Sequence, residues 1–311
     1  MKIHFIIYLS IFMFLLNNTQ AQPNYPGNPY EAKIISSDLK NFIEAYKSLS
    51  AESDSLYVLK EMYFDRASAG MKEFISKHDL TKESVLKAMQ MHPETYSGLE
   101  KFYNDLSVFE SDYIKELEAF KSVMPDAIFP PAILLVGDYR GIAQASRLGQ
   151  LITVETGTKD PDNLLTVMIH ELTHFQQAMK MGVEKYTGVY SKNDNMLDLI
   201  LREGVAEFVT YKLVRNNEDK FTRLKKYEEN ENELWEKFNT DLKDQNSGFW
   251  LSFTIEDINN GIPILPGYAV GYKIVESYYD QNTDKSAALE ELLNISDAQA
   301  FFIKSNYKPA K

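Results

Sequence analysis

The spacing of apolar residues predicts a chain built mainly of helices. Over residues 31–124, apolar side chains recur every three or four positions, which is the period of a helix with one buried face. Ser37 and Asp38 can cap the first helix, because short polar side chains accept the free amides of a first turn. Helices alone are therefore expected in this region, over residues 37–49, 56–75, 81–91 and 94–123.

Two later segments have the pattern of short strands. Residues 132–136 follow a pair of prolines, and residues 151–156 follow a connection that contains glycine. Both segments are rich in strand-forming residues and are bounded by residues that interrupt regular structure. The composition changes at Met124-Pro125, so we expect a helical region over residues 31–124 and a separate domain over residues 125–311.

A longer helix is expected after the second strand. Asp160-Pro161 favours a helix start, because aspartate caps helices and proline suits their first turn, and Gly182 favours its end. This helix contains the run His170-Glu171-Leu172-Thr173-His174. Residues four apart lie one turn apart on the same face, so both imidazoles can reach one ion while Glu171 is turned away by about 100°. Two histidines at this spacing with a glutamate between them indicate a zinc site.

The zinc site requires a third protein ligand. Zinc in a hydrolytic site is held by three side chains and keeps one position open. No histidine follows His174, so the third ligand should be a carboxylate. The metzincin pattern is excluded, because it needs glycine at position 177 and histidine at position 180, where this chain has glutamine and lysine. The best-placed carboxylate is Glu203, in a helix expected over residues 195–213, and Asp194 and Asp198 near the start of that helix are the competing candidates.

A second glutamate lies on the same face of this helix. Glu207 follows Glu203 by four residues, and apolar residues surround both. We assign Glu203 to the metal and Glu207 to a hydrogen bond with the second ring nitrogen of a ligand histidine, a contact that fixes how the ring is turned. Gly204 and Ala206 are small, which should let this helix approach the metal helix closely.

The chain resembles the gluzincin metallopeptidases in two motifs, His170-Glu171-x-x-His174 and Glu203-Gly204-x-Ala206-Glu207. It is similar in particular to a bacterial family of unknown function whose members are described as predicted zinc-dependent proteases. The resemblance covers residues 130–305. It implies a zincin-like domain with a small sheet, an active-site helix and a second helix that bears a glutamate. The expected fold class is therefore α+β and mainly helical, with an all-helical N-terminal region before the zincin-like domain.

The ligand set predicts peptide-bond hydrolysis with one Zn²⁺ per chain. Glu171 is expected to act as general base on a water molecule that zinc activates. The developing oxyanion needs a further donor, and Tyr268 or Tyr272 is the candidate, since both lie near the start of an expected helix and tyrosine has this role in some gluzincins. In zinc peptidases of this general build a strand beside the site often pairs with an extended substrate, and residues 151–155 are the expected strand. The alternative is that this segment is simply an interior strand.

The N-terminus has the pattern of a secretory signal peptide over residues 1–21. Lys2 gives a basic start, residues 5–16 are apolar, and Ala21 precedes the expected cleavage point. The apolar run is shorter than the roughly 20 residues that a membrane span requires. We expect a flexible mature N-terminus over residues 22–30, export to the periplasm or the cell exterior, and no stable membrane insertion.

Composition narrows the functional classes further. The chain has no cysteine, so disulfides and a cysteine nucleophile are excluded. It has 33 basic and 45 acidic residues, a net charge of −12, which argues against nucleic acid as a partner. His78 and His92 are interpreted as surface histidines, and closing helices are expected over residues 284–293 and 298–303.

The sequence therefore predicts an exported zinc peptidase that acts on a peptide or protein substrate. Endopeptidase action is preferred, because no motif that would anchor a terminal amine is recognisable. The alternative is a non-catalytic zinc-binding interaction protein of zincin fold. Glu171 weighs against that alternative, since a purely structural zinc site has no need of a general base.

Overall fold

The fold is that of a computed structural model, which describes residues 25–50, 54–156, 160–192, 194–245, 247–252 and 264–309. The predicted signal peptide and residues 22–24 lie outside these ranges. The chain forms two compact units, one ending at Leu172 and the other beginning at Thr173, so the division falls within a helix. The expected domain boundary at residue 124 stays a prediction.

The unit that ends at Leu172 is mainly helical. Thr81 begins one of its helices with a reciprocal cap, since its side chain accepts the amide of Ser84 and the Ser84 hydroxyl interacts with the amide of Thr81. The first long helix begins at Ser37 as expected but has no side-chain cap, and the Asp38 carboxylate accepts the amide of Ser68 instead. The helical elements are η1 (Pro29–Glu31), α1 (Ser37–Lys47), α2 (Ser55–Leu59), the π-helical η2 (Lys60–Phe64), α3 (Ala69–His78), α4 (Lys82–Met91), α5 (Pro93–Ser97), α6 (Leu99–Asn104) and α7 (Leu106–Val123).

Two of the long helices expected in this region are divided into shorter ones. The segment 94–123 is interrupted at Gly98 and Asp105, both poor helix formers. The helix expected over residues 56–75 is divided into α2, the π-helical η2 and α3. The first part ends at Phe64, and Ser68 caps the start of α3. The helices expected over residues 37–49 and 81–91 are confirmed.

A four-stranded sheet lies in the same unit. Its strands are β1 (Ile34–Ile35), β2 (Ala132–Leu135), β3 (Ala143–Ser146) and β4 (Gly149–Thr153), in the order β1-β2-β4-β3. The first three in that order are parallel, and β3 is antiparallel to β4. The expected strands β2 and β4 are confirmed, whereas β1 and β3 were not predicted, and β1 interrupts a region expected to contain helices alone.

The sheet order corrects one expectation about substrate binding. β4 pairs with β2 on one side, where Ile133 is opposite Leu151, and with β3 on the other, where Ala145 is opposite Gln150. Both backbone edges of β4 are therefore used within the sheet. The expectation that residues 151–155 pair with a substrate is wrong, and the alternative of an interior strand is confirmed for residues 151–153.

The long helix α8 (Pro161–Met181) has the expected bounds. The Asp160 carboxylate accepts the amide of Asn163 at 3.1 Å, and Gly182 follows the helix with a φ of +86°. The elements after α8 are all helical within the described residues: α9 (Val183–Gly188), η3 (Val189–Ser191), α10 (Met196–Phe208), the π-helical η4 (Val209–Val214), η5 (Glu218–Lys220), α11 (Thr222–Glu229), α12 (Glu231–Asp244), α14 (Pro266–Gln281), α15 (Lys285–Leu292) and α16 (Ala298–Ser305).

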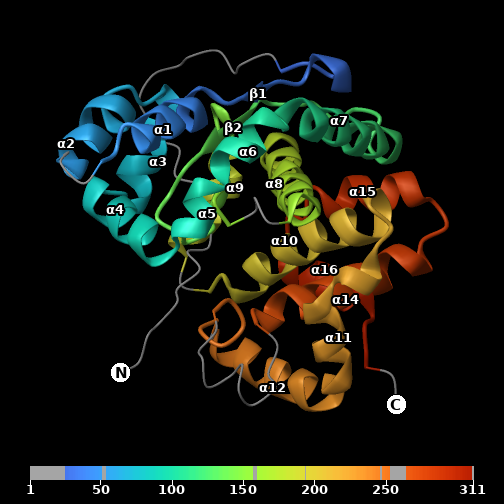
Figure 1. Ribbon diagram of the computed structural model, residues 1–311. Coiled ribbons are helices and arrows are strands. Elements are labelled where there is room, and N and C mark those ends of the chain that lie inside the picture. The colour runs from blue at the N-terminus through green and yellow to red at the C-terminus, as the bar shows by residue number, and fades with distance from the viewer. Residues whose placement is uncertain are drawn as a thin grey trace. The chain divides into compact units, whose positions relative to one another are not determined.

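Helices α10 and α14 run side by side through the core of the second unit (Figure 1). They cross at Gly204 and Gly271, where a side chain on either residue would collide with the backbone of the other helix. The expectation that Gly204 allows a close approach to the metal helix is therefore corrected, since its nearest neighbour is α14. The buried residues of α10 and α14 around this crossing include Ile200, Val205, Phe208, Ala269, Val270 and Ile274.

The expected fold class, α+β and mainly helical with a small sheet, is confirmed. The interpretation of His78 as a surface residue is wrong, because its side chain is buried and its Nε2 lies 2.7 Å from Oε1 of Gln144. His92 is half-buried and stacks on the ring of Tyr139. Among the described helices, none combines the length and the apolar character needed to cross a membrane.

Candidate metal centre

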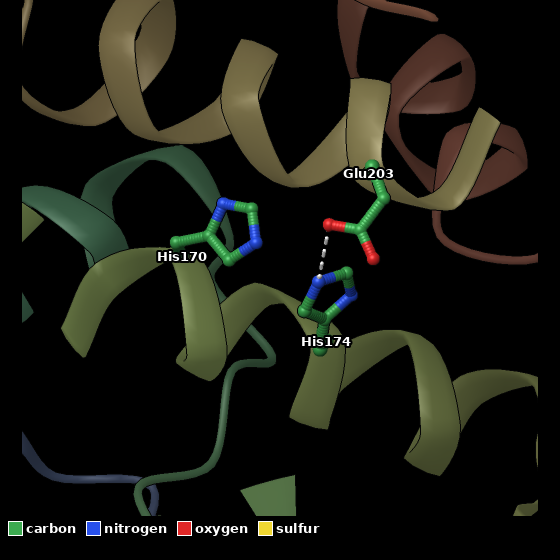
Figure 2. Close-up of side chains that lie close together, drawn as sticks. All are labelled: His170, His174 and Glu203. Carbon is green, nitrogen blue, oxygen red and sulfur yellow. Dashed lines mark hydrogen bonds and ion pairs between the residues drawn. The ribbon is translucent and has the colours of Figure 1, made fainter. Parts of the chain in front are cut away.

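His170, His174 and Glu203 come together as the sequence predicts. Each offers one ligand atom, and the three atoms lie within 4.8 Å of one another. Figure 2 shows both imidazoles on α8 turned toward the carboxylate of Glu203 on α10. His174 and Glu203 are buried, and His170 is half-buried. The competing candidates Asp194 and Asp198 are not part of this cluster.

The geometry and chemistry of this cluster fit Zn²⁺. Nε2 of His174 lies 3.3 Å from Oε2 of Glu203. Two ligand atoms about 2.05 Å from a tetrahedral zinc ion are separated by about 3.3 Å, so this pair already has the spacing of two tetrahedral corners. Two imidazole nitrogens and one carboxylate oxygen are also the ligand set of hydrolytic zinc sites that keep a fourth position open.

The second ring nitrogen of His174 has partners that the sequence analysis did not identify. Its Nδ1 lies 2.9 Å from Oε1 of Gln177, one turn further along α8, and 3.1 Å from the hydroxyl of Tyr186 on α9. From the sequence, Gln177 was noted only because the metzincin pattern has glycine at this position. The spacing of three residues from His174 could have indicated Gln177, but the contact of Tyr186 depends on the turn at Gly182.

Glu207 is buried on α10 and pairs with an arginine. Its Oε1 lies 3.2 Å from a guanidinium nitrogen of Arg223 on α11, and this pair is shielded because Glu207 is only 2% exposed. Arg223 also lies over the ring of Tyr268, with its central carbon 4.8 Å from the ring centroid. The predicted hydrogen bond from a ligand histidine to Glu207 stays a prediction.

The two candidate tyrosines are engaged by different carboxylates. Tyr268 forms a side-chain hydrogen bond with Glu203, and burial, followed by the charge of Glu203, raises the pKa of its phenol well above the ordinary value. Tyr272, one turn further along α14, donates its hydroxyl to Glu218 and packs on Phe208 and Phe221. The structure thus brings Tyr268 to Glu203, a residue of the candidate cluster, and brings Tyr272 to Glu218.

Glu171 follows His170 on α8 and is 6% exposed. Lys77 on α3 interacts electrostatically with this carboxylate and with that of Glu73. Burial lowers the pKa of Lys77 to about 8, although the two carboxylates act in the opposite direction. Lys77 could not be identified from the sequence, because no spacing pattern relates it to Glu171, which lies more than ninety positions later.

Comparison with known proteins gives one match. The family model described as "Predicted Zn-dependent protease (DUF2268)" matches residues 141–300, a range that contains all three residues of the cluster as well as Glu171, Glu207 and both tyrosines. No curated protein and no solved structure matches the chain. The matched segment covers just over half of the sequence, and the chain accordingly belongs to the DUF2268 family of predicted Zn-dependent proteases.

Proposed function

We propose that this chain is a zinc-dependent peptidase in which His170, His174 and Glu203 hold one Zn²⁺. The observation that carries the proposal is the meeting of three ligand atoms within 4.8 Å, from two helices, in a largely buried place. Burying the charge of a carboxylate is costly, and a divalent cation bound between Glu203 and the two imidazoles would compensate that charge. Membership in a family of predicted Zn-dependent proteases supports the same activity.

Glu171 is the proposed general base. When bound, Zn²⁺ supplies two effects, which are a lower pKa for water and polarisation of the scissile carbonyl. Glu171 follows the ligand His170 directly, and its carboxylate takes a proton from the attacking water. It then passes that proton to the leaving amine, so one group acts first as base and then as acid.

Tyr268 is the better candidate for stabilising the oxyanion. Its phenol keeps its proton at neutral pH, because burial raises its pKa well above the ordinary value, and a protonated phenol can donate. Its hydrogen bond with Glu203 supports a position beside the metal ligands. Tyr272 donates its hydroxyl to Glu218, which is not a member of the metal-binding cluster, so its hydrogen bond does not bring it to the proposed ligands.

The proposed substrate is a peptide or protein, and the proposed location is outside the cytoplasm. The export proposal depends on residues 1–21, which have the pattern of a signal peptide. The mass of the protein recovered from the producing cell tests it, since export predicts a chain that begins near Gln22. Recovery of the intact chain with Met1 would contradict export without affecting the proposed chemistry.

The test of the peptidase proposal compares wild type with Glu171→Gln. Both proteins are loaded with zinc and incubated with a mixed peptide library, and cleavage is read by mass spectrometry. We expect one zinc ion per chain in both and cleavage by wild type alone, because the amide of glutamine cannot accept a proton from water. Zinc retention without any cleavage by wild type would instead support the non-catalytic interaction protein. Glu184→Gln on α9 is the matched control and should cleave like wild type.

A further inference from the structure

A chain of polar contacts leads from His174 to the interior of the second unit. It contains Gln177, Tyr186, Tyr190 and Arg202, all of them in the unit that begins at Thr173. We propose that Gln177 and Tyr186 are positioning residues that hold the proton of His174 on Nδ1 and so leave Nε2 bare for a metal ion. This inference deepens the proposed function and rests on it, since it concerns a residue assigned to the zinc.

The orientation of the Gln177 amide carries the first step. Its Nε2 donates to the backbone carbonyl of Arg202 at 3.3 Å, and a carbonyl can only accept. The other end of the amide, Oε1, therefore faces Nδ1 of His174, at 2.9 Å. Because an amide oxygen also only accepts, Nδ1 must be the donor in this contact.

The Tyr186 hydroxyl supports the same proton position. It lies 3.1 Å from Nδ1 of His174 and also forms a hydrogen bond with the hydroxyl of Tyr190. The Tyr190 oxygen receives hydrogen bonds from Tyr186 and Arg202, both of which lower its pKa, although burial raises that pKa overall to about 12. Tyr186 thus donates its proton to Tyr190, and its own oxygen remains to accept the proton on Nδ1.

Arg202 holds Tyr186 in place. The centre of its guanidinium lies 4.1 Å from the centroid of the Tyr186 ring, and its Nη1 donates to the backbone carbonyl of the same tyrosine. Arg202 itself is buried on α10, directly before the proposed ligand Glu203. Arg202 therefore holds both acceptors of the His174 proton. Its backbone carbonyl binds the amide of Gln177, and its guanidinium packs on the ring of Tyr186.

The consequence appears on the opposite side of the imidazole. In a neutral ring with its proton on Nδ1, Nε2 presents a lone pair toward Oε2 of Glu203 at 3.3 Å. Two acceptors facing each other at this distance repel, and a cation that accepts both lone pairs removes the repulsion. The contacts of Gln177 and Tyr186 with Nδ1 thereby leave Nε2 of the ring ready to bind a metal ion.

The test uses Gln177→Met, Tyr186→Phe and the double variant. Methionine and phenylalanine keep the approximate shape of each side chain and remove the acceptor. The proton on His174 is located by long-range ¹H–¹⁵N correlation NMR on the zinc-free protein, and the zinc dissociation constant is measured by competition with a chelator. Gln281→Met and Tyr227→Phe are the matched controls, because they remove an amide and a buried hydroxyl from the same unit.

We expect the proton on Nδ1 in wild type and on Nε2, facing Glu203, in the double variant. Each single variant should weaken zinc binding by about tenfold and the double variant by about 100-fold, and the controls should bind like wild type. A wild-type proton on Nε2, or variants that keep both the wild-type proton position and the wild-type zinc affinity, would overturn the inference. A wild type with its proton on Nδ1 but no affinity for zinc would support the inference and contradict the proposed function, so the two failures are distinguishable.

Discussion

Gly204 of α10 and Gly271 of α14 touch through their backbones. A Cβ atom placed on Gly204 would lie 2.2 Å from the carbonyl carbon of Gly271, and one placed on Gly271 would lie 2.1 Å from the carbonyl oxygen of Ile200. Because backbone atoms cannot turn aside as a flexible side chain can, only glycine fits at either position. The contact joins the helix of Glu203 to the helix of Tyr268, directly beside the proposed zinc ligand.

Alanine at this crossing should separate the two helices. We expect Gly271→Ala to lower the free energy of unfolding by about 1–3 kcal/mol, as overpacking of a core does. It should also weaken zinc binding, since Glu203 lies next to Gly204. Urea denaturation measures the first effect and chelator competition the second.

Gly188→Ala is the control for that substitution. Its backbone is helical, with φ of −59°, and a Cβ there would meet nothing within 4 Å. We expect this variant to be neutral or more stable by up to about 1 kcal/mol, because alanine restricts the unfolded chain. Equal stability of the Gly188 and Gly271 variants would contradict the packing account.

The ion pair between Arg223 and the buried carboxylate of Glu207 should contribute to the stability of the fold. Arg223→Met removes the charge that compensates it and should cost about 3 kcal/mol, toward the low end for buried pairs because the arginine side chain is 29% exposed. Adding Glu207→Gln should restore part of the loss, which a double-mutant cycle of unfolding free energies measures. Strict additivity of the two single changes would show that the pair contributes no coupling.

The two tyrosines of α14 should differ in their effect on catalysis. If Tyr268 donates to the oxyanion, Tyr268→Phe should lower kcat by about 100-fold or more, which is typical for the loss of one such donor. Tyr272→Phe loses a hydrogen bond to Glu218 and should change stability more than kcat. Steady-state kinetics on a peptide identified from the library decide between them, and a larger kcat loss for Tyr272→Phe would reverse the assignment.

Glu155 should make the stability of the protein depend on pH below neutrality. Its carboxylate is buried after β4, where it accepts the amides of Gly137 at 3.0 Å and Tyr139 at 3.3 Å. Burial raises its pKa from 4.5 to about 7. A carboxyl whose pKa is higher in the folded state stabilises that state below the unfolded pKa and loses this contribution as pH rises through the folded pKa.

Glu155→Gln isolates this contribution. The difference in unfolding free energy between wild type and the variant should fall by about 3 kcal/mol between pH 4.5 and pH 7, with wild type relatively more stable in acid. Taking the difference cancels His78, whose pKa is lowered by burial and which therefore destabilises the fold in acid. A difference that is constant over this range would contradict the raised pKa.

The cluster of His170, His174 and Glu203 could be predicted mainly from residues that lie near one another in the sequence. The bounds of α8 follow from Asp160, Pro161 and Gly182, and the helical period alone then puts His170 and His174 on one face. The third member of the cluster, Glu203, required one further step. No histidine follows His174, which called for a carboxylate, and apolar residues surround Glu203. The bounds of α8 and the spacing of its two histidines are local signals, whereas the absence of later histidines draws on the whole remaining sequence.

The features that were missed depend on contacts between distant segments. β3 reads Ala-Gln-Ala-Ser, without the branched side chains that mark strands, and it exists because β4 pairs with it. Nε2 of the buried His78 donates to Oε1 of Gln144, which lies on β3. The amide of Gln177 donates to the backbone carbonyl of Arg202 on α10. Sheet order is likewise set by packing, so the sequence left open whether β4 is an interior strand.

The proposed function requires that His170 and His174 of α8 and Glu203 of α10 bind one zinc ion. Native mass spectrometry of the purified chain titrated with zinc tests it most directly, using wild type, His174→Ala, Glu203→Ala and Glu171→Gln. We expect one zinc ion per chain for wild type and Glu171→Gln, and greatly weakened zinc binding for His174→Ala and Glu203→Ala. Wild type that binds no zinc, or Glu203→Ala that binds zinc as tightly as wild type, would contradict it.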